Sequence, residues 1–294
     1  MSAPYAPQIS FIITCKGRLT HLRQTVPSLL SDLFDATPEQ MGCEVIVVDY
    51  DCPERTDRWI AENFKEIKVA KVSGEEFFNL SRARNIGAQK ASGRWLCFLD
   101  ADNRVNAGFR RWLSNNIKES FFYLQEKESP TLDLPKASGI LICTKENFLK
   151  VGGYDEAFAS WGGEDLDIQD RLIRVGIIPR RFPHEFIHVL DHDDSLRTAF
   201  YKEKEKYKSY MISRYYMHIK QFMMGTLGRG RDLPLDARKK IMMEITDAFG
   251  DWAPGMQCSI KSKGFVFNHT FQLGRKLKME KRIKIEIDIL EDFA

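Results

Sequence analysis

The sequence lacks long apolar runs, paired cysteines and a strong excess of either charge. None of its uncharged apolar runs approaches the roughly 20 residues that a membrane-spanning helix needs. The net charge of +3 is too small to indicate nucleic-acid binding by itself. The six cysteines are scattered without CxxC pairs, which argues against a zinc site built from them and is typical of buried free thiols. We also find no internal repeat and no low-complexity segment.

The N-terminus does not have the pattern of a secretion signal. The segment MSAPYAPQISFIIT has no basic start followed by an apolar stretch and a small-residue cleavage site. We therefore expect a cytoplasmic location. With 43% hydrophobic residues among 294, the chain can bury a substantial core, as one large domain or as one domain plus an accessory piece.

The first hundred residues alternate between short apolar runs and segments with helical spacing of apolar residues. The apolar runs predict strands at Ile9–Ile13, Val45–Val48, Ile67–Val72 and Trp95–Leu99. The segments between them predict helices. This alternation indicates an α/β fold whose mostly parallel sheet is covered by helices on both faces.

Polar clusters follow three of the predicted strands. They are Thr14–Arg18, Asp49–Asp51 and Asp100–Asp102. In a parallel α/β sheet, ligands bind outside the carboxyl ends of the strands. We therefore expect these clusters, although distant in sequence, to meet at one rim.

Asp100 and Asp102 come directly after a buried apolar strand. Carboxylate oxygens suit Mg²⁺ and Mn²⁺, and a divalent ion there would bridge the two phosphates of a nucleotide diphosphate. A bare Asp-x-Asp pair is also common in ordinary turns. Its position after the strand favours the metal-binding interpretation.

The segment Trp161–Asp167 places three carboxylates, Glu164, Asp165 and Asp167, at the start of a predicted helix. The positive end of the helix dipole favours ionised carboxylates. We therefore expect a carboxylate there to stay charged near neutral pH and to accept a proton from an attacking hydroxyl. Trp161 offers a face on which a sugar ring can stack. The alternative is an ordinary capped helix with a core tryptophan.

His188 and His192 flank the end of a further predicted strand. Neutral imidazole is a suitable third ligand for Mn²⁺ beside carboxylates. Either histidine could equally be a plain surface or core residue. We expect one of them to bind metal, with His188 first because it follows the strand most directly.

Together these motifs resemble the family 2 glycosyltransferases of the GT-A fold, a Rossmann-like fold of nucleotide-diphospho-sugar transferases. The resemblance covers roughly residues 9–197. Three motifs match the family: Ile12–Arg18, the Arg–Asn–Gly helix Ser81–Gly87, and Asp100–Asp102. A fourth segment, Val47–Cys52, corresponds to the family's "VVDD-S" motif but departs from it at the third and fourth polar positions. The later motifs Gly152–Glu156 and Trp161–Asp167 resemble the galactosyltransferase-type half found in β-1,4-galactosyltransferases and chondroitin-type polymerases.

The resemblance implies a role for each matching residue. The residues expected to hold the donor are Thr14, Arg18, Asp49 near the uracil, Arg84 facing the diphosphate, and Asp100 on the ribose or a metal-bound water. The residues expected to hold Mn²⁺ or Mg²⁺ are Asp102 with His188 or His192. Asp165 would be the catalytic base, with Glu164 and Trp161 on the acceptor sugar. The retaining polypeptide GalNAc-transferases often have Asn where this chain has Asp165, which favours inversion.

The sequence therefore predicts an inverting, metal-dependent glycosyltransferase. It would move a sugar, such as a hexosamine or galactose, from a UDP-sugar to a carbohydrate hydroxyl in polysaccharide or glycan synthesis. The alternatives are a non-catalytic nucleotide-sugar-binding module and a retaining GalNAc-transferase-like enzyme. A nucleotidyltransferase is disfavoured because Cys15–Arg18 makes a poor phosphate loop.

We predict a catalytic domain over residues 1–198 and a mainly helical accessory extension over 199–294. The basic, aromatic stretch Tyr201–Met224 has helical spacing. It either packs on the catalytic domain, which we favour, or contacts an anionic membrane at its inner face. Isoleucines alternate with charges near the C-terminus, which indicates a strand or an amphipathic tail.

Overall fold

The computed structural model describes residues 8–34, 41–129, 137–227 and 233–250, and beyond these the backbone of 258–261, 265–273, 275–283 and 286–289. The chain divides into two compact units. The first comprises residues 1–156 and 163–204, and the second comprises 157–162 and 205–294. The division thus follows Lys204, where the sequence placed the boundary after residue 198, and it assigns a short piece around Trp161 to the second unit.

The first unit is built on a seven-stranded sheet in the order β3-β2-β1-β4-β7-β6-β8. Four strands are parallel: β1 (Ile9–Cys15), β2 (Cys43–Tyr50), β3 (Lys68–Val72) and β4 (Trp95–Asp100). Strand β7 (Leu141–Thr144) runs antiparallel to β4, whereas β6 (Phe121–Gln125) and β8 (Ile178–Phe182) are parallel to each other. The predicted fold class is confirmed, with a mostly parallel sheet at its centre.

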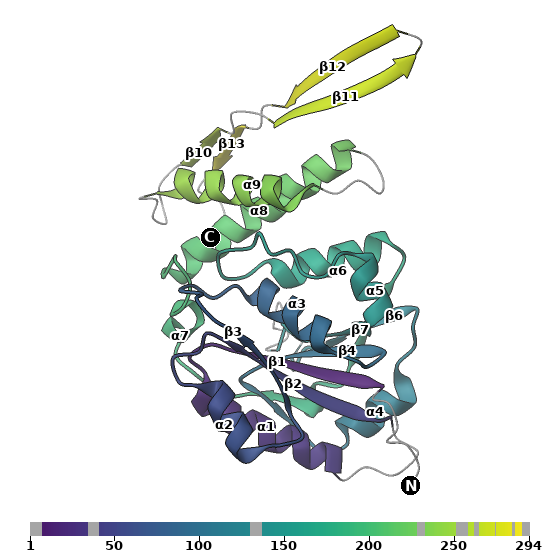
Figure 1. The fold of residues 1–294 in the computed structure, drawn as a ribbon, viewed down its shortest axis with the longest axis vertical. Helices are drawn as coiled ribbons and strands as arrows, with labels where there is room; N and C mark the ends of the chain where they lie inside the picture. The colour runs from purple at the N-terminus through teal and green to yellow at the C-terminus, as the bar shows by residue number, and fades with distance from the viewer. Residues whose placement is uncertain are drawn as a thin grey trace. The chain divides into compact units, whose positions relative to one another are not determined.

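Helices cover both faces of this sheet, as Figure 1 shows. One face packs against α1 (Leu19–Phe34), α2 (Thr56–Asn63) and α4 (Phe109–Asn116). The other packs against α3 (Leu80–Lys90), α5 (Lys145–Lys150) and α6 (Glu164–Arg174). Strand β1 is buried along its whole length because its side chains alternate between the two faces of the sheet. Phe11 packs in the core on one face, and Ile12 packs in the core on the other.

A second, two-stranded sheet brings a late segment beside the end of β4. Strand β5 (Asn103–Val105) pairs antiparallel with β9 (Ile187–Val189), which follows the short 3-10 turn His184–Phe186. The backbone N–H of Leu190 donates to the carbonyl of Asp102 at 2.8 Å. The chain then continues through α7 (Ser195–Thr198). The segment that carries both candidate histidines is thus attached to the Asp100–Asp102 loop.

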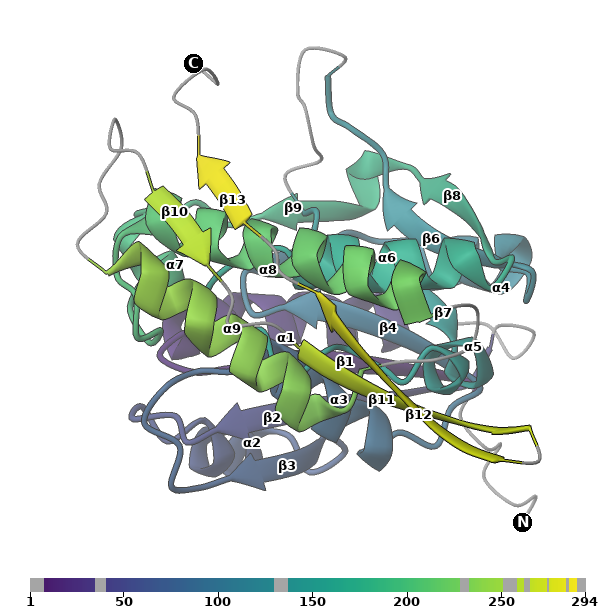
Figure 2. The same cartoon turned by 90° about the horizontal axis from the view of Figure 1, so that it is seen from above.

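The described residues of the second unit form two helices and four strands. Helices α8 (Lys206–Leu227) and α9 (Leu235–Phe249) lie side by side in Figures 1 and 2 and share an apolar core. Strand β10 (Cys258–Lys261) pairs with β13 (Glu286–Ile289), and β11 (Phe265–Leu273) pairs with β12 (Arg275–Ile283). Among the described helices, none is both long enough and apolar enough to span a membrane.

Candidate functional site

The guanidinium of Arg84 joins the two acidic stretches that the sequence singled out. Arg84 lies on α3, and its side chain is only 1% exposed. Its Nη1 donates to Asp165 Oδ1 at 2.5 Å, and its Nη2 donates to Asp100 Oδ1 at 2.9 Å. The end of β4 and the start of α6 therefore meet at one place, although 65 residues of sequence separate their aspartates.

Neighbouring backbone makes room for this arrangement. The carbonyl of Gly139 accepts a bond from Arg84 Nη2 at 3.2 Å. A Cβ on Gly139 would lie 2.6 Å from Asp100 Oδ2, so a larger residue could not occupy this position without moving the carboxylate. The ring of Tyr154 covers the guanidinium, with its centroid 4.9 Å from Cζ. Sequence reasoning missed Gly139, which carries no recognisable motif.

Arg84 is therefore engaged with protein carboxylates. Burial opposes its charge, but Asp165 and Asp100 raise its pKa well above the ordinary value. Both Nη atoms already have protein partners, so the contacts of Arg84 are those of a positioning residue, and its predicted place facing the diphosphate stays a prediction.

Helix α3 reaches this position by lying unusually close to the sheet. A Cβ on Gly87 would lie 2.3 Å from Ile12 Cγ2. Asn85 fixes the turn at Tyr154 through two hydrogen bonds. Its Oδ1 accepts the backbone N–H of Tyr154 at 2.9 Å, and its Nδ2 donates to the backbone carbonyl of Tyr154 at 2.9 Å. The Arg–Asn–Gly motif thus combines a buried cation, a turn clamp and a close helix–sheet contact.

Replacing Arg84 by Met is expected to lower the free energy of unfolding by about 3–5 kcal/mol, because it leaves Asp165 without its cation. Urea unfolding followed by fluorescence measures this loss. Arg82→Met on the same helix is the matched control, because its ion pair with Glu75 is partly exposed and worth at most about 1 kcal/mol. Equal losses in the two variants would contradict the positioning role of Arg84.

Glu164 and Asp165 open α6 after Gly163, whose φ of 90° only glycine adopts readily. Burial, together with the charge of Asp165, raises the pKa of Glu164 well above its ordinary value. Burial also raises the pKa of Asp165, although Arg84 opposes the shift. Burial thus opposes the charge that the helix terminus favours, and the expectation that a carboxylate there stays charged near neutral pH stays a prediction. A raised pKa makes Asp165 a stronger proton acceptor when it is ionised.

Asp102 has one of the two candidate histidines as its partner. His192 Nε2 lies 2.8 Å from Asp102 Oδ2, and its imidazole is only 2% exposed. His188 lies on β9 opposite Arg104, and both residues are exposed. Burial, and then the charge of Asp100, raise the pKa of Asp102. The structure therefore favours His192 over His188, the first choice from sequence, as the imidazole beside Asp102.

These groups fit a divalent cation. Carboxylate oxygens and one neutral imidazole are the donor set that Mn²⁺ accepts. We expect His192→Ala to weaken Mn²⁺ binding at least about 10-fold, whereas His188→Ala leaves it unchanged. Isothermal titration of Mn²⁺ in the presence of UDP measures both affinities. The opposite ranking would restore His188 as the ligand.

The β1–α1 loop supplies groups next to this pair. Thr14 is buried and lies opposite Asp100 in the sheet register. Burial lowers the pKa of Arg18, an effect that the nearby charge of Asp102 opposes. Within the described part of the chain, Arg18 Nη1 is buried without a hydrogen-bond partner. An anionic oxygen would satisfy this donor, as predicted for a nucleotide phosphate.

His21 also belongs to this neighbourhood, although sequence reasoning did not identify it. Its ring lies edge-on to that of His192 with centroids 5.5 Å apart, and burial and the charge of Arg18 lower its pKa. Because His21 lies one helical turn after Arg18, its helical position in α1 was the signal that could have found it.

Asp49 has a structural task of its own. Its side chain is buried, and its two oxygens accept the backbone N–H groups of Cys52 at 2.8 Å and Asp57 at 2.6 Å. These bonds hold the turn between β2 and α2. The predicted place of Asp49 near the uracil stays a prediction.

Trp161 belongs to the second unit. Its backbone N–H donates to Ser209 Oγ at 2.7 Å, and its ring lies near Tyr210 and Lys206 of α8. Its predicted role as a platform for a sugar ring stays a prediction.

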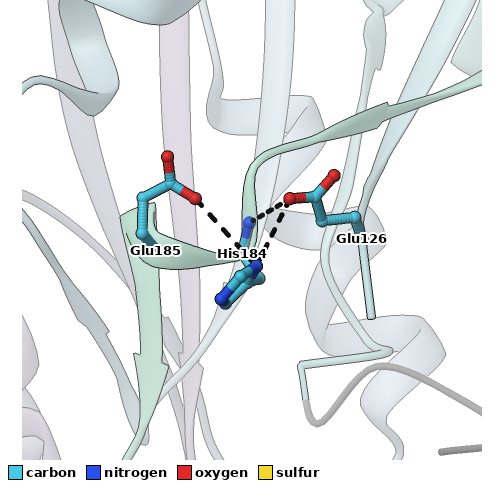
Figure 3. Close-up of side chains that lie close together, drawn as sticks. All are labelled: Glu126, His184 and Glu185. Atoms are coloured by element: carbon cyan, nitrogen blue, oxygen red, sulfur yellow. Dashed lines mark hydrogen bonds and ion pairs between the residues drawn. The ribbon is translucent and has the colours of Figure 1, made fainter. Parts of the chain in front are cut away.

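The described residues contain one group of three side chains whose ligand atoms converge, and it was not predicted. Figure 3 shows Glu126, His184 and Glu185 close together. His184 Nδ1 lies 3.3 Å from Glu126 Oε1 and 4.0 Å from Glu185 Oε2. All three side chains are at least 44% exposed. We interpret the group as a solvated ion-pair cluster, which contributes little to stability.

Comparison with known proteins gives two family matches that follow one another along the chain. The model of glycosyl transferase family 2 matches residues 10–116, and that of the N-terminal domain of galactosyltransferase matches residues 124–193. Together they contain the β1–α1 loop, Arg84, the Asp100–Asp102 loop and the start of α6.

Curated relatives agree with these matches. A putative polypeptide N-acetylgalactosaminyltransferase 13 of Drosophila melanogaster is 25% identical over 80% of this chain and 53% of its own length. Beta-1,4-galactosyltransferase 2 of Cricetulus griseus is 29% identical over 38% of this chain and 32% of its own. An uncharacterized glycosyltransferase of Haemophilus influenzae is 28% identical over 51% of this chain and 58% of its own. The chain thus spans between 32% and 58% of the length of these relatives.

Solved structures share the fold at low identity. S. aureus TarS 1-349 in complex with UDP-GlcNAc superposes with a TM-score of 0.55 at 14% identity, covering 84% of this chain and 73% of that one. The mannosyltransferase PcManGT of Pyrobaculum calidifontis, in complex with GDP-Man and Mn²⁺, has a TM-score of 0.50 at 16% identity, covering 85% and 76%. The predicted resemblance is thereby confirmed: this chain has the GT-A fold and carries a glycosyl transferase family 2 segment followed by a galactosyltransferase segment.

Proposed function

We propose that the protein is an inverting, metal-dependent glycosyltransferase that moves a sugar from a UDP-sugar to a carbohydrate hydroxyl. The observation that carries this proposal is the bridge from Asp100 through Arg84 to Asp165. It places a carboxylate able to accept a proton beside the strand end that carries the candidate cation ligands. The two matched families meet at this same bridge.

On the donor side, Asp102 and His192 would hold Mn²⁺ or Mg²⁺, which offsets the charge that develops on the departing diphosphate. The unpaired Nη1 of Arg18 would donate to a phosphate oxygen. Thr14 would contribute to the wall of the donor site at the end of β1. These roles support UDP-sugar binding, and TarS, which has a similar fold, was solved in complex with UDP-GlcNAc.

On the acceptor side, Asp165 would remove the proton of the attacking hydroxyl. Arg84 holds Asp165 in place through Nη1. Glu164, buried beside them with a pKa raised well above its ordinary value, would contact the acceptor sugar. A positioned base supports a single displacement with inversion, because no second nucleophile is needed.

The donor is proposed to be a UDP-hexosamine or UDP-galactose. The named relatives include N-acetylgalactosaminyl- and galactosyltransferases, which act on sugars of this class. The acceptor is proposed to be a glycan in a cytoplasmic synthesis pathway. A contact of α8 with the inner face of a membrane stays a prediction, which retention on anionic liposomes at low salt would support.

A screen of UDP-sugars for Mn²⁺-dependent UDP release tests the proposal. Turnover with one donor, and an inverted anomeric configuration of the product in NMR spectra, are the expected results. UDP binding without turnover of any donor would favour the non-catalytic binding module. A retained configuration would favour a mechanism like that of a retaining GalNAc-transferase.

A further inference from the structure

Two cysteine side chains lie in one buried cluster where β1 and β2 end. Cys15 is the last residue of β1, and Cys52 follows the end of β2. Cys15 lies opposite Asp49 in the register of these strands, and Asp49 Oδ1 accepts the backbone N–H of Cys52 at 2.8 Å. Cys15 Sγ lies 3.3 Å from Thr56 Oγ1, and the backbone N–H of Gly17, two residues after Cys15, donates to Cys52 Sγ at 3.2 Å. The backbone around Asp49 and Gly17 thus holds the two cysteines as neighbours.

We propose that Cys15 and Cys52 form a modification site at which a hydroperoxide produces a reversible intramolecular disulfide. The other described cysteines lack this arrangement. Cys97 and Cys143 are fully buried in the sheet, and Cys43 donates to a backbone carbonyl at the opposite end of β2. Cys52 keeps 5% of its surface exposed, so a reagent as small as hydrogen peroxide can reach it.

The surroundings divide the two thiols into an attacking and a resolving partner. The hydrogen bond from Cys15 is the largest of several effects that lower the pKa of Cys52 to about 6. The hydrogen bond with Cys52 and burial raise the pKa of Cys15 well above its ordinary value. Cys52 is therefore a thiolate at neutral pH, and the thiolate is the nucleophile in such reactions. Cys15 keeps its proton until the second step.

The reaction balances with one peroxide. The Cys52 thiolate attacks one oxygen of hydrogen peroxide, the O–O bond breaks, and Cys52 becomes a sulfenic acid while hydroxide leaves and is protonated. Cys15 Sγ then attacks the sulfenic sulfur and loses its proton, and the sulfenic hydroxyl leaves as water. Two thiols are oxidised to a disulfide, and one peroxide is reduced to two waters. A dithiol reductant reverses the change by exchange.

The disulfide would also act on the β1–α1 loop, an effect that rests on the proposed function. It removes the thiolate that accepts the N–H of Gly17, and Gly17 has little freedom to adjust. Its φ is 65°, and the ring of Phe200 fills the space where a side chain would begin. Thr14 and Arg18 flank these residues. We therefore expect oxidation to weaken UDP binding at least several-fold.

Mass spectrometry of the full-length protein tests the site directly. After treatment with hydrogen peroxide and alkylation, a proteolytic peptide pair linked through Cys15 and Cys52 is expected, and dithiothreitol should release it. Cys43→Ser is the matched control and should still form the link, whereas Cys52→Ser should not. Alkylation of both cysteines after peroxide treatment, or sulfinic acid on Cys52 without a link, would overturn the proposal.

Titration with UDP and Mn²⁺ before and after oxidation tests the effect on the loop. A linked protein with unchanged UDP affinity would refute the coupling while leaving the disulfide site intact. A reduced protein that binds no UDP would count against the proposed function instead, and the peptide analysis would still decide the thiol chemistry.

Discussion

Asp165→Asn is expected to stop sugar transfer while donor binding remains. The substitution keeps the shape of the side chain but removes its ability to take a proton, and loss of general-base help typically costs about 10²–10⁴ in rate. Initial rates of transfer and the Kd of the UDP-sugar, measured with Mn²⁺ present, separate the two effects. The rate should fall by this factor, and the Kd should change little, because Asp165 is not among the predicted donor ligands and the side-chain oxygen of Asn can still accept a bond from Arg84 Nη1.

The pH profile of the wild-type enzyme gives a second test of the same residue. Burial raises the pKa of Asp165 above its ordinary value of 3.8. Because the base must be deprotonated, activity should increase with pH through this raised pKa, at a higher pH than an ordinary aspartate would allow. Asp165→Asn should lose this dependence.

A matched variant separates catalysis from stability. Asp170→Asn removes another carboxylate of α6, one that pairs with Arg174 in the following turn. This variant should remain active, and the thermal unfolding of both variants should be followed in parallel. Full turnover by a folded Asp165→Asn protein would exclude Asp165 as the base.

Asp102→Ala should abolish Mn²⁺ dependence together with activity. The substitution removes a carboxylate that would hold the cation and also removes the partner of His192 Nε2. Loss of a group that stabilises developing charge commonly costs about 10²–10³ in rate, and we expect at least this loss. UDP release measured over a range of Mn²⁺ concentrations shows whether a residual activity can be restored by excess metal.

Asp191→Ala is the control for this variant. Asp191 is an exposed aspartate in the same segment as His192, so the substitution changes the net charge equally. It should leave the Mn²⁺ dependence unchanged. If Asp102→Ala retained a normal metal dependence, the cation would have to bind elsewhere, and the exposed cluster around His184 in Figure 3 would be the first place to examine.

The central strands could be predicted because each contains a continuous apolar run. The strand segment Val45–Val48 is buried on both faces, and a continuous apolar run of this kind predicts a strand inside a parallel sheet. The motifs at the strand ends then converge by topology alone. This is why Thr14–Arg18, Asp49–Asp51 and Asp100–Asp102 could be expected at one rim from the sequence, whereas the site role of Asp165 came from the family resemblance.

The outer strands have no such pattern. Strand β8 is the edge strand of the sheet, and Ile178, Pro179, Arg180 and Arg181 are all exposed. Charged and proline residues at an edge prevent pairing with other chains, but they also hide the strand from a search for apolar runs. Strand β6 was missed as well, and with it the group of Glu126 and His184.

Side-chain direction was the other quantity that the sequence could not supply. His188 and His192 are equivalent by residue type and spacing, yet β9 turns His188 to the exposed side and the following loop returns His192 to Asp102. Likewise, the family resemblance implied that Arg84 faces the diphosphate but did not reveal its bonds to two protein carboxylates. The burial of Arg84 depends on how closely α3 approaches the sheet, and the local sequence does not predict this distance.

That close approach makes the reactive centre depend on a residue that never touches it. Gly87 faces the underside of α3, with Ile12 2.3 Å from the place where a methyl group would begin. Any side chain there would lift the helix and carry Arg84 with it, separating the aspartates that Arg84 joins. Inactivating substitutions should therefore be sought in the layer beneath the helix as well as among the reacting groups, and a redesign of this protein for new sugars should leave that layer untouched.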